Sequence, residues 1–189
     1  MTRRLLALST LLLIASAAAM AAPINLVWNG GFETGNFSGW AQSGDNSYTF
    51  VDRNWHQNGD YAGTFGPIAG YGYIAQNLYT VAGETYDLSF WIWGTAYGVP
   101  DAGITVQWNG ATILTSASPT YNTWTQISIP GLVATSDSTL LSLGFRNGPY
   151  YYWVDDVSVT GLTSAPEPAT FAIVGAALLG LGLLRRRAH

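Results

Sequence analysis

Cysteine and lysine are both missing from this 189-residue sequence, and charged residues make up only 10% of it. Without cysteine, a disulfide framework, a cysteine zinc site and thiol chemistry are all excluded. All seven basic residues are arginine and the formal net charge is −4, which argues against a protein that binds the phosphates of nucleic acid. The chain is instead rich in aromatic residues (14%, including eight Trp), so it is not a disordered polar tail.

The first 22 residues have the layout of a secretory signal peptide. Arg3 and Arg4 form a basic start, and residues 5–15 are apolar. Ala19-Met20-Ala21 then has the small residues of a cleavage site. We expect cleavage after Ala21 or Ala22; an uncleaved N-terminal anchor is the alternative.

A second targeting unit occupies residues 164–189. It consists of a Pro-Glu-Pro motif, an apolar run and a basic tail: Pro166, Glu167 and Pro168; residues 169–184; and residues 185–189, which begin with Arg185, Arg186 and Arg187. As a helix rising ~1.5 Å per residue, the apolar run would be ~24 Å long, short of the ~30 Å of a hydrocarbon core. We therefore expect a C-terminal transmembrane helix that anchors the chain only transiently, with the arginines on the cytoplasmic side.

The ordered set of motif, apolar helix and arginine cluster resembles the PEP-CTERM protein-sorting signal. The resemblance implies processing near the Pro-Glu-Pro motif by an exosortase. It also implies a Gram-negative bacterium that makes extracellular polysaccharide, with delivery to the outer surface or the extracellular matrix. An ordinary single-pass tail anchor is the alternative.

Between the two ends, residues 23–163 have the pattern of one all-β domain. This stretch holds every acidic residue except Glu167 but only two arginines, so its formal charge is −8. Apolar residues alternate with polar ones in several short runs, the clearest of which is Tyr86, Leu88, Phe90 and Ile92. Asn109-Gly110 predicts a tight hairpin. No run of helical period reaches ten residues, so the pattern favours a two-sheet sandwich or a barrel.

Four segments, in order along the chain, resemble carbohydrate-binding-module-like jelly rolls. They are "NLVWNGGFETGNFSGW" (25–40), "NGDYAGTFG" (58–66), "IAQNLYTVAGETYDLSFWIWG" (74–94) and the final-strand motif "YYWVDDVSVT" near residues 152–160. The resemblance implies a galactose-binding-like fold: a two-sheet antiparallel jelly-roll sandwich, here between an N-terminal signal helix and a C-terminal transmembrane helix. Function does not follow from the fold alone.

One acidic residue is predicted to be buried. Strict alternation in the last predicted strand puts Asp155 on the same face as Trp153, Val157 and Val159, and we expect that face to point inward. A buried carboxylate needs a cation or several hydrogen-bond donors. Because basic residues are scarce, calcium, which takes six to eight oxygen ligands, is a suitable partner.

In similar jelly rolls a structural calcium ion joins the first and last strands. Carried over by resemblance, its ligands here would be the carboxylates of Glu33 and Asp155 and carbonyl groups near Gly31 and Asp60. The alternative is a pair of carboxylates that cap backbone N–H groups without a metal.

A glycan-binding surface is the second hypothesis. Trp91 and Trp93 lie on the face of their predicted strand opposite the Tyr86 set, and Trp and Tyr rings can stack on the apolar faces of sugars. Trp55, in a loop with Arg53 and His56, could complete the site together with Arg146 and Tyr150. The alternative is that Trp91 and Trp93 simply pack under a loop or a terminal strand.

Catalysis is not expected. His56 is the only histidine of the 23–163 stretch, and it lies in no recognisable nucleophile motif. The sequence therefore predicts an exported, non-catalytic protein associated with exopolysaccharide or biofilm that could bind glycan. A structural or adhesive surface protein without sugar affinity is the alternative.

Overall fold

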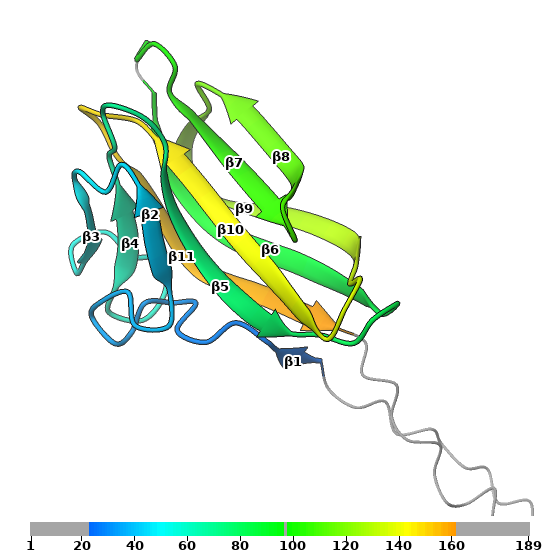
Figure 1. Ribbon diagram of the computed structural model, residues 1–189. Coiled ribbons are helices and arrows are strands. Elements are labelled where there is room, and N and C mark those ends of the chain that lie inside the picture. Colours follow the sequence, from blue (N-terminus) through cyan, green and yellow to red (C-terminus); the bar gives the residue numbers. More distant parts are fainter. Residues whose placement is uncertain (1–22, 97, 162–189) are drawn as a thin grey trace, which may run out of the picture. The chain divides into compact units, whose positions relative to one another are not determined.

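The computed structural model describes residues 23–96 and 98–161, and these form a β-sandwich without helices (Figure 1). The predicted signal helix, PEP motif and C-terminal membrane helix lie outside these residues. Among the described residues, no helix has the length and apolarity needed to cross a bilayer.

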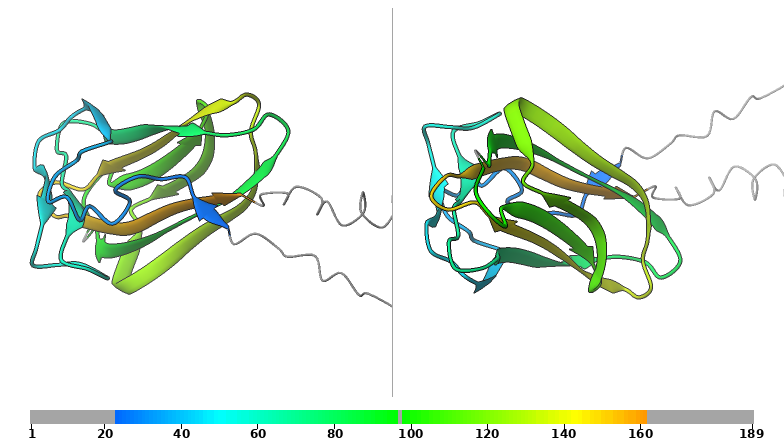
Figure 2. Two further views of the ribbon diagram at one scale, coloured as in Figure 1. Left: turned by 90° about the horizontal axis from the view of Figure 1, so that it is seen from below. Right: turned by 90° about the horizontal axis from the view of Figure 1, so that it is seen from above.

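Two antiparallel sheets face each other (Figure 2). The first, called the β6–β11 sheet, has the strand order β3 (Thr49–Asp52), β4 (Ala62–Phe65), β11 (Tyr152–Gly161), β6 (Thr85–Thr95) and β9 (Thr120–Val133), and β1 (Ile24–Asn25) also pairs with β11. The second, called the β5–β10 sheet, has the order β2 (Ala41–Gly44), β5 (Gly72–Tyr79), β10 (Ser138–Arg146), β7 (Gly103–Trp108) and β8 (Ala111–Ala117). The predicted all-β fold of two antiparallel sheets is confirmed.

The core lies between the two sheets and follows the predicted alternation. On β6, the inward residues Leu88, Phe90 and Ile92 are fully buried. Phe145 of β10 faces them from the other sheet and stacks on Phe65, with ring centroids 4.3 Å apart. Burying a side chain of this size contributes ~1.5–3 kcal/mol, so the alternating runs account for much of the stability of the sandwich.

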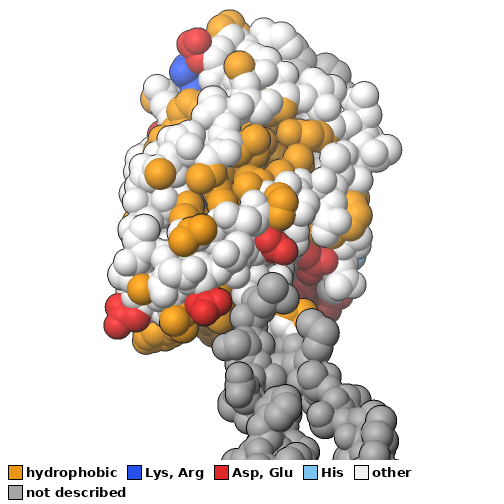
Figure 3. Space-filling view, turned by 90° about the vertical axis from the view of Figure 1, so that its right-hand side faces the viewer, with side chains coloured by type: hydrophobic (Ala, Val, Ile, Leu, Met, Phe, Trp, Pro, Cys, Tyr) orange, Lys and Arg blue, Asp and Glu red, His pale blue; other side chains and the backbone are white. Residues whose placement is uncertain are grey.

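The β7–β8 connection is the predicted hairpin. Asn109 and Gly110 both have positive φ angles, 50° and 81°, which a two-residue turn of this kind requires. Beyond it, β8 and β9 end the two sheets on the same side. Figure 3 shows apolar side chains gathered in the middle of this side of the molecule. Ile113 of β8 and Ile127 and Ile129 of β9 are half-buried against the core.

A β-bulge in β11 reverses the alternation at its middle. Asp156 has a φ of 50°, and the pairing of β11 with β6 shifts register after Asp155. Trp153 and Asp155 therefore lie on the outer face of the sheet, whereas Val157 and Val159 point into the core. The prediction that all four share one inward face is wrong, because the bulge inserts one residue between the two pairs.

Candidate functional site

A cluster of three tryptophans covers part of the outer face of the β6–β11 sheet. Trp93 of β6 and Trp153 of β11 are direct cross-strand neighbours, with ring centroids 4.7 Å apart. Trp55 comes from the β3–β4 loop, residues 53–61, and stacks on Trp93 at 4.6 Å with an interplanar angle of 9°. The loop thus lies over the sheet, and the Trp55 ring remains 47% exposed.

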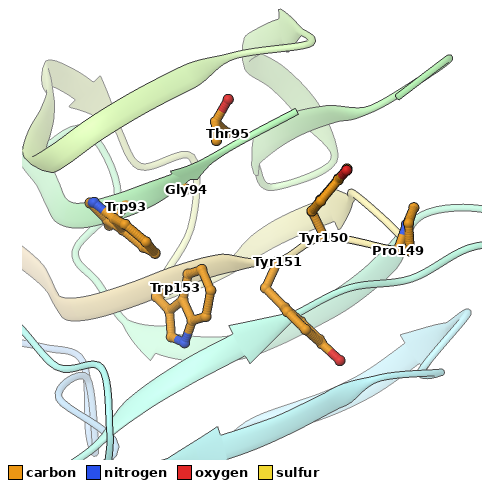
Figure 4. A pocket seen from close by; sticks show the side chains of 7 residues that line it. All are labelled: Trp93, Gly94, Thr95, Pro149, Tyr150, Tyr151 and Trp153. Carbon is orange, nitrogen blue, oxygen red and sulfur yellow. The ribbon is translucent and has the colours of Figure 1, made fainter. Parts of the chain in front are cut away.

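Beside this tryptophan cluster is a pocket of about 200 Å³ (Figure 4). Its lining comes from the end of β6, the start of β11 and the loop before β11: Trp93, Gly94, Thr95, Pro149, Tyr150, Tyr151 and Trp153. Every lining residue that the structure describes is uncharged, and five of these seven contribute an aromatic or proline ring. Tyr150 at the rim is 43% exposed, so the pocket combines ring surfaces with access from solvent.

The wall of the pocket depends on a glycine. Gly94 has a φ of +130°, and a Cβ atom there would lie 2.4 Å from the carbonyl oxygen of Tyr151. Only glycine lets β6 and the start of β11 approach this closely in that backbone conformation. The aromatic residues on either side are brought together by this close approach.

The structure unites some of the predicted glycan-binding residues and separates others. Trp93 and Tyr150 both line the pocket, and Trp55 stacks on Trp93 without being part of the lining. Trp91 also lies on the outer face of β6, but it is opposite Asp155 and does not line the pocket. Arg146 ends β10 in the other sheet, where it pairs with Asp101 at 3.4 Å.

Two residues of the pocket, Tyr151 and Trp153, were not among the predicted site residues. Strict alternation along the last strand predicts that Trp153 points inward with Val157 and Val159. The bulge at Asp156 reverses this prediction and puts Trp153 on the outer face. The signal that could have found them is the aromatic run at residues 150–153, since three successive aromatic residues and a Trp cannot all point into one core.

The predicted calcium-ligand residues do lie close together, around the same loop. Asp155 is 0% exposed and accepts backbone N–H groups from Gln57 at 2.8 Å and Asn58 at 3.1 Å. Glu33 accepts the N–H of Asp60 at 3.1 Å. A Cβ atom on Gly31 would lie 3.6 Å from both the Asp155 Oδ1 and the Glu33 Cγ atoms. The two carboxylates therefore tie the 53–61 loop to β11 and to the turn after β1.

Burial governs the acidity of the neighbouring carboxyls of Asp155 and Asp156. It raises the pKa of Asp155 to about 6, against the opposing effect of the backbone N–H groups of Asn58, Gln57 and Asp156. Burial also raises the pKa of Asp156, and the negative charge of Glu33 adds to the increase. Across residues 23–96 and 98–161, no three His, Cys, Asp or Glu side chains are grouped to hold a metal. A cation here would therefore need backbone carbonyl ligands in addition to side chains.

At the end of the chain, the family model described as the PEP-CTERM protein-sorting motif matches residues 164–187. The chain carries a PEP-CTERM sorting motif. The PEP-CTERM motif implies a secreted protein that is processed by an exosortase and has a C-terminal membrane-anchor signal. A comparison with curated proteins found no match to the chain.

The sandwich is similar to solved carbohydrate-binding modules. TmCBM61, solved in complex with β-1,4-galactotriose, aligns with a TM-score of 0.59 and 21% identity over 72% of this chain and 97% of that one. The CBM22-1 xylan-binding domain of Paenibacillus barcinonensis Xyn10C aligns with a TM-score of 0.55 and 16% identity over 79% and 100%. A solved structure of another kind, the enzymatically active domain of bacteriophage CBA120 tailspike protein 4, aligns with a TM-score of 0.57 and 14% identity. That alignment covers 73% of this chain and 21% of the tailspike chain. At these identities the similarity shows the fold.

Proposed function

We propose that this chain is an exported, exosortase-processed protein of the cell surface or extracellular matrix whose sandwich binds glycan and catalyses no reaction. The observation that carries the proposal is the pocket lined by Trp93, Trp153, Tyr150 and Tyr151, next to the exposed ring of Trp55. The PEP-CTERM motif supports the export step. Association with exopolysaccharide or biofilm on the outer surface of a Gram-negative bacterium is part of the same proposal.

The chemistry of the pocket favours a sugar over most other ligands. A pyranose ring has apolar C–H faces that stack on aromatic rings and hydroxyl groups at its edge that remain near water. Aromatic side chains also bring large contact areas at low entropic cost. An exposed aromatic surface of this kind often marks a binding site.

The non-catalytic part of the proposal rests on the acidic residues. The buried carboxyl of Asp155 and its neighbour Glu33 accept hydrogen bonds from backbone N–H groups of the 53–61 loop. They lie outside the lining of the pocket. A general acid or base must reach a reacting group in the site, and none of the lining residues in the described part of the chain is an acid or a histidine.

We also propose that a structural calcium ion can bind between Glu33 and Asp155, with carbonyl oxygens near Gly31 and Asp60 as further ligands. Two carboxylates beside a turn offer the oxygen donors that calcium prefers. The ion would strengthen the tie between the 53–61 loop and β11, and thereby hold Trp55 against Trp93.

Binding to the exported polysaccharide of the host tests the glycan proposal. We expect Trp93→Ala and Tyr150→Ala each to weaken binding by about tenfold or more, because they remove aromatic contact area at the centre and the rim. Tyr79→Ala is the matched control, since Tyr79 is 89% exposed on β5 in the other sheet. If Trp93→Ala and Tyr150→Ala both bind the polysaccharide as tightly as the wild type and Tyr79→Ala do, this pocket is not the binding site. Failure of the intact protein to bind any glycan would favour the structural or adhesive alternative.

A further inference from the structure

We infer that the pocket takes the methyl-bearing edge of a neutral deoxy sugar, with 6-deoxyhexoses as the ligand class. The inference rests on the proposed function, because it specifies which sugars the same pocket prefers. It follows from the distribution of polar atoms around the pocket, from its size and from the charge of the domain.

The surfaces that the seven described lining residues turn toward the pocket are almost entirely C–H. In Figure 4 the hydroxyl groups of Tyr150 and Tyr151 lie at the ends of their rings away from Trp93 and Trp153. The indole nitrogens of the two tryptophans lie on the sides of their rings away from Tyr150. The Thr95 hydroxyl lies within hydrogen-bond distance, 3.2 Å, of the Thr120 hydroxyl on β9.

A hydroxyl group inserted among these rings would lose its hydrogen bonds to water and find few protein partners. Such a loss raises the free energy of binding, whereas the transfer of a methyl group out of water lowers it. A sugar that presents a methyl group in place of its 6-hydroxyl should therefore bind more tightly. Its remaining hydroxyl groups would stay at the rim, in solvent.

The pocket has room for one sugar unit only. Its volume of about 200 Å³ lies below the ~300–1,000 Å³ of typical small-molecule sites. We therefore expect it to accept a single residue, as a side branch or chain end, rather than several units of a backbone.

The charge of the domain selects against acidic sugars. Residues 23–161 carry ten acidic side chains and two arginines, for a formal charge of −8. One of those arginines, Arg146, is paired with Asp101. The resulting field repels uronic acids and sulfated sugars, so the ligand is neutral.

The test compares sugars that differ only at carbon 6. The exported, processed protein is titrated with L-fucose against L-galactose, L-rhamnose against L-mannose, and D-fucose against D-galactose, with binding followed by NMR chemical-shift changes. We expect about tenfold tighter binding of the 6-deoxy member in at least one pair, with shifts at the indole N–H signals. Trp93→Ala and Tyr150→Ala should each abolish the preference, and Tyr79→Ala should keep it.

Each outcome separates this inference from the proposed function. Equal affinities within every pair, together with sensitivity to Trp93→Ala, would overturn the deoxy-sugar preference and leave glycan binding in place. A preference that persists in both Trp93→Ala and Tyr150→Ala would place its origin elsewhere and also overturn the inference. No binding of any monosaccharide or of the host polysaccharide would overturn both.

Discussion

At the scale of single residues, Asp155 determines how the 53–61 loop is held. Its side chain is fully buried on the outer face of the β6–β11 sheet, under that loop, and accepts three backbone N–H groups. These donors favour the charged form and burial disfavours it, and burial has the larger effect, since the pKa is raised to about 6. Two predictions concern this residue and its neighbour Glu33.

The first prediction concerns pH. Because the pKa of Asp155 is higher in the folded state than the value of ~3.9 expected when unfolded, its contribution to stability is complete below pH ~4 and is lost as pH rises through 6. A difference of about two units corresponds to ~3 kcal/mol. In chelator, we expect the free energy of unfolding of the wild type to fall more steeply from pH 4 to 7 than that of Asp155→Asn, as measured by urea denaturation. Identical slopes for the two proteins would contradict the assignment.

The second prediction concerns calcium. If the ion binds Glu33 and Asp155 only in the folded state, calcium at about 100 times its dissociation constant adds ~2.7 kcal/mol to stability. We expect calcium to raise the melting temperature of the wild type but not that of Glu33→Gln. Thermal scans with added calcium and with chelator measure this shift. Asp137→Asn, in the β9–β10 connection, is the control and should respond to calcium as the wild type does. No shift in the wild type would leave the carboxylates as caps of backbone N–H groups alone.

At the scale of elements, the bulge in β11 decides which side chains reach the pocket. Asp156 is in the left-handed region, which aspartate tolerates and β-branched residues do not. We expect Asp156→Val to destabilise the fold by ~1–3 kcal/mol and to disturb the position of Trp153. Asp156→Asn should be close to wild type. Denaturant unfolding and near-ultraviolet circular dichroism would measure both effects, and equal stability of the two variants would show that the bulge is not required.

The strands that follow a simple alternation could be predicted from the sequence. The inward face of β6 and the β7–β8 hairpin depend only on local pattern and turn residues, and both are confirmed. The side on which Trp153 lies could not be predicted, because the bulge that sets it depends on pairing with β6, which is distant in sequence. The stacking of Trp55 on Trp93 likewise depends on a loop held down by carboxylates from two other parts of the chain. That Arg146 lies in the other sheet could not be predicted for a related reason, since the place of β10 depends on its pairing with β5 and β7.

At the scale of the whole molecule, the chain combines a PEP-CTERM sorting motif with an acidic β-sandwich of the carbohydrate-binding-module type. The two ends are predicted to be removed or processed, and five of the seven arginines lie within them. The proposed functional product is thus more acidic than the full chain.

This organisation gives a prediction about the mature protein. In a host with exosortase we expect mass spectrometry to find a product that begins near Ala22 or Pro23 and lacks the residues after the Pro-Glu-Pro motif. In an exosortase-null strain the C-terminal segment should remain and the protein should fractionate with membranes. An intact C-terminus in both strains would contradict the processing step.

The nearly parallel rings of Trp55 and Trp93 also give the protein an optical property. Two indole chromophores 4.6 Å apart are close enough for their excited states to couple, and we expect a paired positive and negative band in circular dichroism if their transition moments are twisted relative to each other. Because Trp93 also lies 4.7 Å from Trp153 on the sheet itself, lifting the loop would change this signal by removing the contribution of Trp55. The molecule therefore carries an intrinsic spectroscopic reporter of loop closure, readable without any added label.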